Sequence, residues 1–255
     1  MNGELAAVGQ AGHLDEHVAD TSVGVVTAPR STVLFGASHV LERTARSVLQ
    51  WTVDVFAAER IALVSAFGPG STVLIDMLAS IAPDLPVVFV DTLHHFPETL
   101  EHVERVRDRY RLNLRVVSPA GTRAEFERLY GPRLWQRDLD RYQQVAKVEP
   151  FRRATEALDG WITGRRRDQS SSRADMPAVE MNRRARVNPL AGWTRADVWR
   201  FIHERRLPYN PLHDRGYASI GDQPLTAPVA AGEHERAGRW QGTDRVECGI
   251  HEQPE

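Results

Sequence analysis

Apolar residues in this chain form short runs that alternate with amphipathic segments. Residues 36–60 place apolar side chains at helical spacing, which predicts one amphipathic helix or two. The run at 61–64 (IALV) predicts a buried strand, and the segment 72–81, after the turn SAFGPGS, predicts a helix. The pattern therefore places a strand, a glycine-rich turn and a helix in succession.

The same alternation recurs further along the chain. Residues 85–90 (LPVVFV) and 114–117 (LRVV) predict two more strands, on either side of a charged helix at 98–110. A fourth strand is predicted at 160–163 (GWIT), and a fifth begins at 186–187. Strands separated by helices are typical of an α/β fold, with a parallel, twisted sheet and helices on both faces.

Three parts of the chain differ in organisation. Residues 1–30 are rich in Gly and Ala and are predicted to be poorly ordered, whereas residues 31–206 carry the α/β alternation. Within that part, Thr194 begins a helix with Asp197 in the capping-box position. Pro and Gly accumulate in residues 207–255, which are predicted to form an irregular, mobile tail.

Composition limits the class of protein. The 255 residues are 42% hydrophobic, which is enough for the core of one α/β domain, and the net charge of −2 gives no field that attracts nucleic acid or an anionic membrane. No apolar run approaches the roughly 20 residues that span a bilayer, and the N-terminus lacks the apolar stretch of a secretion signal. A single cysteine excludes an internal disulfide and a thiolate metal site. We expect a cytoplasmic protein.

The first candidate site is the turn at 65–71, because ligands of doubly wound sheets bind beyond the carboxyl ends of strands. Backbone N–H groups near the start of a helix can hold an anion there. The turn lacks the lysine of a Walker loop, so an ordinary turn between strand and helix is an equal alternative. The residues proposed to bind a ligand are Ser65, Phe67, Gly68 and Ser71.

The second candidate is the segment DTLHHFPET after the second strand. Asp91 can accept hydrogen bonds from a ribose or an adenine amino group there. The pair His94 and His95 does not favour a metal site, because adjacent side chains diverge on most backbones. Pro97 fits the first position of the following helix.

The third candidate is the segment WITGRRRDQS, where Gly164 precedes three arginines. A guanidinium group can bind phosphate or sulfate through two hydrogen bonds at once. The sequence therefore predicts an anion site at Arg165, Arg166 and Arg167. A solvated basic loop is the alternative reading.

The single cysteine, Cys248, lies in the polar tail sequence VECGIH. An exposed thiol in the cytoplasm indicates redox or nucleophilic chemistry. The neighbouring carboxylate of Glu247 disfavours a thiolate, so activation requires cations, which the arginine segment or His251 can supply. His251 is also a candidate for binding a substrate phosphate, and a helix-end or surface histidine is its alternative. Arg239, earlier in the tail, is a further candidate cation, and a solvated role is its alternative.

Together, these segments resemble the PAPS/APS reductase family, from about residue 61 to 251. SAFGPGS stands where that family has its modified PP-loop, and DTLHHFPETL resembles its DTGxxFPET segment, with Leu93 in place of Gly. WITGRRRDQSSSRA is similar to its arginine loop, and VECGIH to its terminal E-C-G-[LI]-H signature.

The resemblance implies an adenine-nucleotide-binding α/β fold of the PP-loop type with a mobile C-terminal tail. It implies that Cys248 attacks the sulfur of 3′-phosphoadenylyl sulfate (PAPS) or adenylyl sulfate (APS) and becomes an S-sulfocysteine. A thiolate of reduced thioredoxin or glutaredoxin then releases sulfite. Because the chain has no second cysteine, the dithiol must be external. Both a monomer and a homo-oligomer are compatible with the sequence.

One departure from the family concerns a cofactor. Many relatives hold an iron–sulfur cluster on four cysteines, and the resemblance places Gln143, Gln144, Asp222 and Leu225 at those positions. We therefore expect no cluster and no bound metal. Lys147 remains at a position that the family keeps basic near the substrate sulfate.

Members without the cluster are usually PAPS reductases, so PAPS is the favoured substrate. APS is the alternative, because NPLAGW, YNPLHDRGY and APVAAGEHERAGRW read more like the cluster-bearing APS branch. A PP-loop ATP-dependent adenylyltransferase is a second alternative, which would need Mg²⁺ and no tail cysteine. A nucleotide-binding protein without catalysis is a third.

Overall fold

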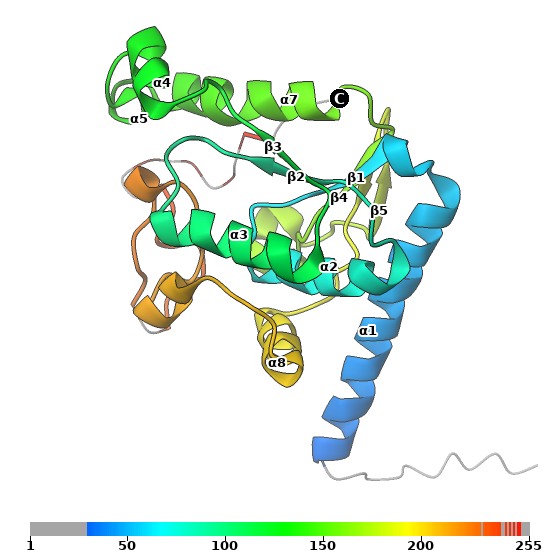
Figure 1. The fold of residues 1–255 in the computed structure, drawn as a ribbon. Helices are drawn as coiled ribbons and strands as arrows, with labels where there is room; N and C mark the ends of the chain where they lie inside the picture. Colours follow the sequence, from blue (N-terminus) through cyan, green and yellow to red (C-terminus); the bar gives the residue numbers. More distant parts are fainter. Residues whose placement is uncertain are drawn as a thin grey trace, which may run out of the picture.

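A six-stranded sheet forms the centre of the molecule (Figure 1). The computed structural model describes residues 30–230, 232–240, 243, 245, 247, 249 and 250, with side chains from residue 38 onward. The strand order is β3-β2-β1-β4-β6-β5. All neighbours are parallel except β5 and β6, which are antiparallel. The strands are β1 (Ile61–Val64), β2 (Val87–Val90), β3 (Leu114–Val117), β4 (Gly160–Ile162), β5 (Val179–Met181) and β6 (Ala185–Val187).

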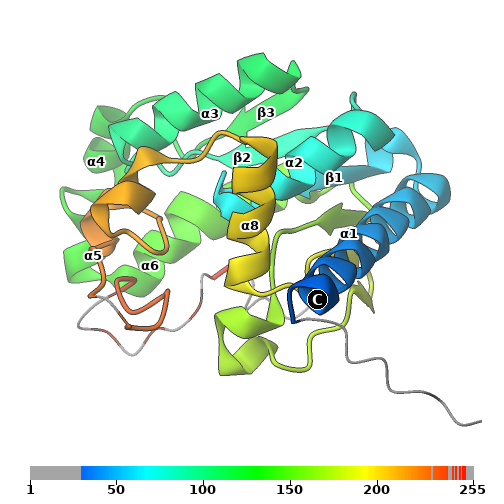
Figure 2. The same ribbon diagram turned by 90° about the horizontal axis from the view of Figure 1, so that it is seen from below.

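Helices cover both faces of this sheet, as the sequence predicted (Figures 1 and 2). One face carries α1 (Arg30–Val55), α2 (Pro69–Ile81), α3 (Pro97–Tyr110) and α8 (Arg195–Arg205). The other side carries α4 (Arg123–Tyr130), α5 (Leu134–Arg137), α6 (Leu139–Gln143), the π-helix η2 (Gln144–Val148) and α7 (Glu149–Thr155). Short 3-10 helices are η1 (Ala58–Arg60), η3 (Arg167–Gln169), η4 (Ser171–Arg173), η5 (Pro211–Arg215) and η6 (Gln223–Leu225).

The two-residue period of the strands explains how the sheet is buried on both sides. In β1, Ile61 and Leu63 pack into the large core beneath α2, whereas Ala62 points to the opposite face, where it meets Val88 and Leu158. Strands that are buried on both faces read as continuous apolar runs, which is why IALV and VVFV were recognisable from the sequence.

Some element bounds differ from the prediction. Helix α2 begins at Pro69, three residues before the predicted start at 72, because proline at the first helical position is already set to the helical φ. The capping box of Thr194 and Asp197 is present at the start of α8. Strand β5 was not predicted, because its residues VEM form a short, half-exposed edge with no apolar run.

The first part of the predicted tail packs against the α/β core. Residues 207–240 contain η5 and η6, and Leu212 and Trp240 are buried. Asn210 Nδ2 donates to Thr99 Oγ1 at 3.0 Å, so this segment, orange in Figures 1 and 2, lies beside the start of α3. Residues 1–29 and most of 241–255 lie outside the described residues, and the predictions of order and mobility made for them are not addressed by the structure.

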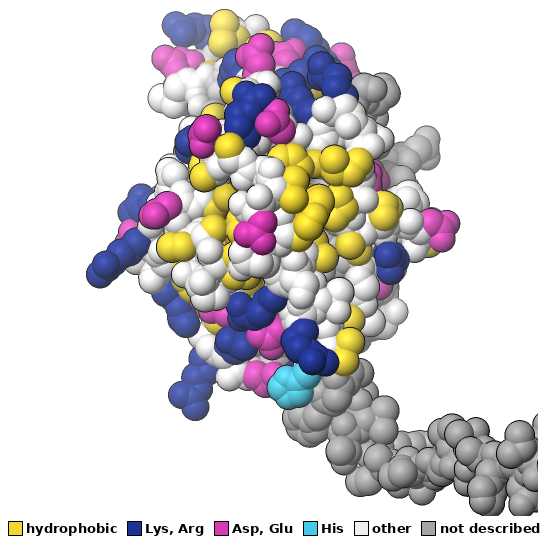
Figure 3. Space-filling model, turned by 90° about the vertical axis from the view of Figure 1, so that its right-hand side faces the viewer, with side chains coloured by type: hydrophobic (Ala, Val, Ile, Leu, Met, Phe, Trp, Pro, Cys, Tyr) yellow, Lys and Arg dark blue, Asp and Glu magenta, His cyan; other side chains and the backbone are white. Residues whose placement is uncertain are grey.

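Apolar side chains also reach the surface. Figure 3 views the side along which α1 runs, where apolar groups gather and charged side chains surround them. Val40, Trp51 and Val55 of α1 are among the exposed large apolar residues. Among the described residues, no helix combines the length and apolar character that crossing a bilayer requires.

Candidate active site

A cavity of about 260 Å³ opens at the carboxyl edge of the sheet. The chain runs from β1 outward to β2 and β3 on one side, and β4 and β6 lie on the other, so the strand order reverses between β1 and β4. Such a reversal leaves a crevice in which α/β sheets bind their ligands. The cavity is lined by the turns after β1 and β4, the first turns of α8, and residues of the segments 218–222 and 235–240.

The turn after β1 presents backbone N–H groups at the cavity. Gly68 is the N-cap of α2 and provides no side-chain cap, so the N–H groups of the first helical turn keep their capacity to bind an anion. Ser65, Gly68 and Ser71, three of the residues proposed to bind a ligand, line the cavity. Phe67 does not: its φ of 54° turns the ring into the core, against Phe89 at 5.5 Å.

The predicted arginine triplet divides among different environments. Arg165 and Arg166 line the cavity together with Gly164, whereas Arg167 lies outside it and donates from Nε to the carbonyl of Met176 at 2.8 Å. Arg166 is still extended, whereas Arg167 begins the 3-10 helix η3, so the path of the backbone changes between these two residues.

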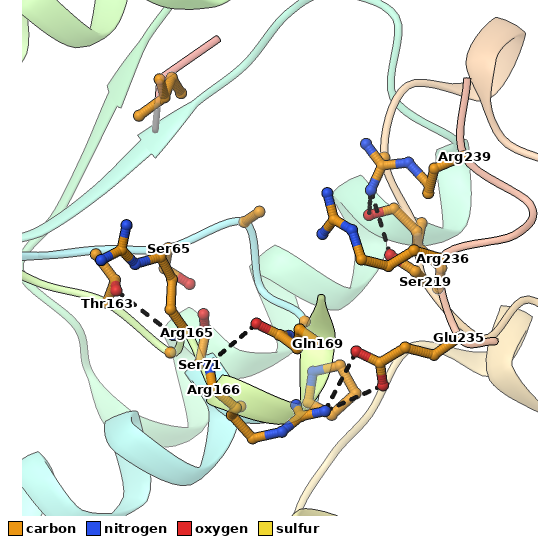
Figure 4. Close-up of a pocket in the computed structure, with 18 of the residues that line it drawn as sticks. Ser65, Ser71, Thr163, Arg165, Arg166, Gln169, Ser219, Glu235, Arg236 and Arg239 are labelled. Atoms are coloured by element: carbon orange, nitrogen blue, oxygen red, sulfur yellow. Dashed lines mark hydrogen bonds and ion pairs between the residues drawn. The ribbon is translucent and has the colours of Figure 1, made fainter. Parts of the chain in front are cut away.

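Acidic partners hold the two arginines that line the cavity. Arg165 pairs with Glu180, and burial lowers the pKa of its guanidinium although Glu180 opposes this. Arg166 pairs with Asp168 at 2.9 Å. It also pairs with Glu235 at 3.0 Å, as Figure 4 shows. The guanidinium groups of Arg165 and Arg166 are therefore fixed by ion pairs and form part of the cavity wall.

Two arginines of the tail face the turn after β1. Figure 4 shows Arg236 and Arg239 extending from the tail into the space opposite Ser65 and Ser71. Arg239 donates to Ser219 Oγ at 3.4 Å, and its guanidinium lies 4.5 Å from the centroid of the Trp240 ring. Arg239 was predicted. Arg236 was not predicted as a site residue. The sequence signal that could have identified it is its position three residues before Arg239.

The segment after β2 contributes Thr92 and His95 to the cavity, but not Asp91. Asp91 Oδ1 instead accepts a hydrogen bond from the backbone N–H of Leu93 at 2.8 Å and closes a turn. Leu93 has a φ of 65°, a conformation that glycine adopts without steric cost. In the DTGxxFPET segment that this region resembles, the corresponding position is glycine. In this chain Leu93 adopts the same kind of turn.

The paired histidines diverge, as their adjacency predicted. His94 is buried with its ring against Phe126, Trp135 and Tyr142, and burial lowers its pKa. His95 Nε2 lies 3.2 Å from the carbonyl oxygen of Val90. Within the described part of the chain, no group of three or more His, Cys, Asp or Glu side chains is arranged to hold a metal ion.

Residues on both sides of Cys248 are placed at the cavity. Glu247 accepts hydrogen bonds from Arg173 Nη2 at 2.6 Å and from Ser170 Oγ at 3.1 Å, and Ile250 lines the cavity. Burial alone would raise the pKa of Glu247, but hydrogen bonding and charge from Arg173, with the charge of Arg236, lower it. Cys248 and His251 themselves lie outside the described residues.

Of the four positions at which the resemblance places cluster cysteines, Asp222 lines the cavity. Gln143 is buried at the end of α6, and Leu225 packs in the same small apolar cluster as Tyr142. Asp222 is buried and pairs with Lys147, Nζ to Oδ2, at 2.7 Å. Amide, carboxylate and aliphatic side chains are not the thiolate set that an iron–sulfur cluster of this kind requires, so these residues do not fit it.

Residues 60–228 match the family model of the phosphoadenosine phosphosulfate reductase domain. The chain belongs to the PAPS/APS reductase family. It is 41% identical over 215 residues to the adenosine 5′-phosphosulfate reductase of Anoxybacillus flavithermus, a match that covers 83% of this chain and 91% of that protein. It is 46% identical over 199 residues to the phosphoadenosine 5′-phosphosulfate reductase of Gloeobacter violaceus, covering 76% and 83%.

Solved structures agree with this membership. The crystal structure of PAPS reductase from Candida auris in a phosphate complex has a TM-score of 0.66 and 32% identity, covering 81% of this chain and 100% of that chain. The FMN adenylyltransferase of Candida glabrata, with FMN and an ATP analogue, has a TM-score of 0.58 at 20% identity, covering 79% and 69%. The latter shows a shared fold only. This member of a sulfonucleotide reductase family thus has the predicted α/β fold.

Proposed function

We propose that this chain reduces PAPS to sulfite and adenosine 3′,5′-bisphosphate in sulfate assimilation, with Cys248 as nucleophile and reduced thioredoxin as electron donor. One observation carries the proposal: Glu247 and Ile250, which flank Cys248 closely in sequence, lie at a cavity that also holds Arg236, Arg239 and the anion-binding turn. The thiol therefore belongs to a tail that reaches a site built for anions.

The chemistry balances with one protein thiol and an external dithiol. The Cys248 thiolate attacks the sulfuryl sulfur, an S–S bond forms, and the bond from that sulfur to the phosphate oxygen breaks, releasing adenosine 3′,5′-bisphosphate. A thioredoxin thiolate then attacks the cysteine sulfur of the S-sulfocysteine, and sulfite leaves. The second thioredoxin thiol resolves the mixed disulfide, so thioredoxin supplies the two electrons. Glutaredoxin is the alternative donor.

The lining residues divide the remaining work. The N–H groups after Gly68 and the hydroxyls of Ser65 and Ser71 hold phosphate oxygens, and Arg236 and Arg239 neutralise charge on the sulfuryl and phosphate groups. The packed tail excludes water, which would otherwise compete with the thiolate for the sulfuryl sulfur. Phe67, Asp91 and Arg167, which we expected to bind substrate, do not line the cavity and have no role in this scheme. No bound metal or cluster takes part in this scheme.

Arg195 supports PAPS over APS. It lines the cavity at the first position of α8 and is exposed, and within the described part of the chain its guanidinium has no acidic partner. The Asp168 carboxylate accepts from the backbone N–H of Arg195 at 2.6 Å and not from its guanidinium, which is suited to the additional 3′-phosphate of PAPS. With APS as substrate, the same steps would release AMP.

Replacement of the thiol tests the proposal. Cys248→Ser should abolish sulfite formation while the variant still binds PAPS, and parental protein incubated with labelled PAPS without thioredoxin should gain one sulfonate on Cys248 by intact-mass measurement. Sulfite production by Cys248→Ser at the parental rate would refute the mechanism. Release of pyrophosphate from ATP by the protein would instead support the adenylyltransferase alternative.

A further inference from the structure

Lys147 is the only lysine among the 255 residues, and all other basic side chains except histidine are arginines. It is part of the π-helix η2, its side chain lines the cavity, and only 6% of the residue is exposed. A π-helical turn inside helical structure is rare and often marks a functional position. Lysine offers a compact point charge on a flexible stem, whereas arginine offers a planar fork. The chain thus keeps one flexible ammonium at a buried position of the cavity wall.

A single carboxylate fixes that ammonium. Asp222 is 0% exposed, and its Oδ2 lies 2.7 Å from Lys147 Nζ. Its other oxygen, Oδ1, accepts a hydrogen bond from Thr92 Oγ1 at 2.8 Å. Oδ2 therefore has an ion-pair partner and Oδ1 a hydrogen-bond donor, and such compensation is what a buried charge requires.

The backbone around Asp222 is fixed as well. Asp222 forms an antiparallel bridge with His95, and the N–H of Gln223 donates to the carbonyl of His94 at 2.8 Å. Burial would raise the pKa of Asp222, but the charges of Lys147 and His95 and the hydrogen bonds from Lys147 and Thr92 outweigh it and hold the pKa well below its usual range. The carboxylate is consequently ionised at neutral pH and attracts the ammonium.

We propose that Asp222 is a positioning residue, which holds the Lys147 ammonium in the cavity wall for the anionic end of the sulfonucleotide. A lysine stem has several rotatable bonds, and a point charge assists a reaction most when it does not have to be ordered at each turnover. The proposal rests on the proposed function for the identity of the anion.

A double-mutant cycle tests this role. Asp222→Asn keeps the shape of the side chain and an oxygen for Thr92, but removes the charge. We expect kcat/KM for PAPS to fall about 10- to 100-fold, chiefly through KM, as it should in Lys147→Met. If Asp222 acts through Lys147, the double variant is no worse than Lys147→Met. The proposal would be overturned if the two single losses of kcat/KM added in the double variant, or if Asp222→Asn had the parental kcat/KM.

A matched control separates the role from a general effect of losing an ion pair. Asp159 pairs with Arg60 at the exposed amino ends of β4 and β1, far from the cavity edge of these strands. Asp159→Asn should leave kcat/KM at the parental value. Thermal melting of each variant reports whether it is folded.

Because there is only one lysine, its ammonium can be observed directly, even if Asp222→Asn is too unstable for kinetics. In Cys248→Ser protein labelled with ¹³C-lysine, the single side-chain CH₂ signal next to the nitrogen should shift when PAPS binds. PAPS binding, measured by calorimetry, without such a shift would overturn the proposal. If PAPS does not bind at all, the proposed function fails. Asp222 is then tested by whether Asp222→Asn changes the Lys147 signal of the free protein, and an unchanged signal refutes its positioning role.

Discussion

Gly70 and Gly164 bring the two turns that line the cavity into close backbone contact. A Cβ placed on Gly70 would lie 2.9 Å from the carbonyl oxygen of Gly164, and one placed on Gly164 would lie 3.0 Å from the amide nitrogen of Ser71. The obstructing atoms are backbone atoms, which move only if a loop moves. Glycine at both positions therefore sets the separation of the turns after β1 and β4.

Gly164→Ala should push these turns apart by a few tenths of an ångström. We expect about a tenfold loss of affinity for the nucleotide, since small displacements of positioning groups have large effects on binding and rate. Titration calorimetry with adenosine 3′,5′-bisphosphate measures the change. Gly192→Ala is the control, because its new Cβ would meet only Leu41 Cδ2 at 3.9 Å, an ordinary contact. Equal affinities for Gly164→Ala and the parent would contradict this account of the pocket.

Arg195→Ala should separate the two candidate substrates. If its guanidinium meets the 3′-phosphate, kcat/KM for PAPS falls about tenfold, the size of one lost charge-assisted hydrogen bond, while kcat/KM for APS stays the same. Steady-state rates with both nucleotides and thioredoxin decide this. Arg128→Ala, at an exposed position of α4, should change neither value. A parallel loss with both nucleotides would remove the structural support for PAPS.

Glu247→Gln should weaken the attachment of the tail. The substitution keeps an oxygen for Ser170 but removes the charge that pairs with Arg173 and Arg236. We expect about a tenfold lower kcat/KM and faster hydrogen exchange in residues 235–250, because hydrogen bonds to charged groups contribute more than neutral ones. Glu204→Gln, exposed on α8, serves as the control. Parental exchange rates in the tail of Glu247→Gln would show that these ion pairs do not hold it.

Two buried histidines should make the fold sensitive to acid. Burial lowers the pKa of both His102 and His213 to about 4, with the charge of Arg105 adding to the effect on His102. Above the ordinary histidine value neither state binds the proton. As the pH falls from about 6.5 to about 4, only the unfolded chain takes it up, so the free energy of unfolding decreases.

Urea unfolding at a series of pH values measures this dependence. The slope of the unfolding free energy against pH reports how many more protons the unfolded chain binds than the folded one. His102→Gln should reduce this number by up to about one between pH 6.5 and about 4, whatever its effect on stability at pH 7. His39, an exposed histidine of α1, provides the control His39→Gln, whose slope should match the parent. An unaltered slope in His102→Gln would mean that His102 takes up its proton in the folded state.

The apolar pattern was sufficient for most of the fold. Strands β1, β2 and β3 and helices α2 and α3 were predicted within a few residues, because each is buried on a face that its local sequence already displays. Strand β5 escaped prediction because a short, half-exposed edge strand depends on its neighbour β6 rather than on its own residues.

The site was predicted less completely than the fold. Four of the residues proposed to bind substrate line the cavity, because a position in a turn after a strand is a local property: Ser65, Gly68, Ser71 and Gly164. Asp91 and Arg167 were chosen for their chemistry, but the backbone turns them away from the cavity. Arg236 lies more than 70 residues beyond Arg165 and reaches the cavity only through the path of the tail, which no local pattern encodes.

By itself, the sequence determined which chemistry is available: one thiol, one side-chain ammonium, a glycine-rich turn and a set of arginines, in an order that follows the strands of a parallel sheet. Only the tertiary structure decided which of these groups meet. Lys147 pairs with Asp222, 75 positions away, and Asp222 bonds to Thr92, 130 positions away. Hydrophobic periodicity fixes how each element is buried, whereas the direction of a polar side chain is set by the loops and distant segments that pack around it.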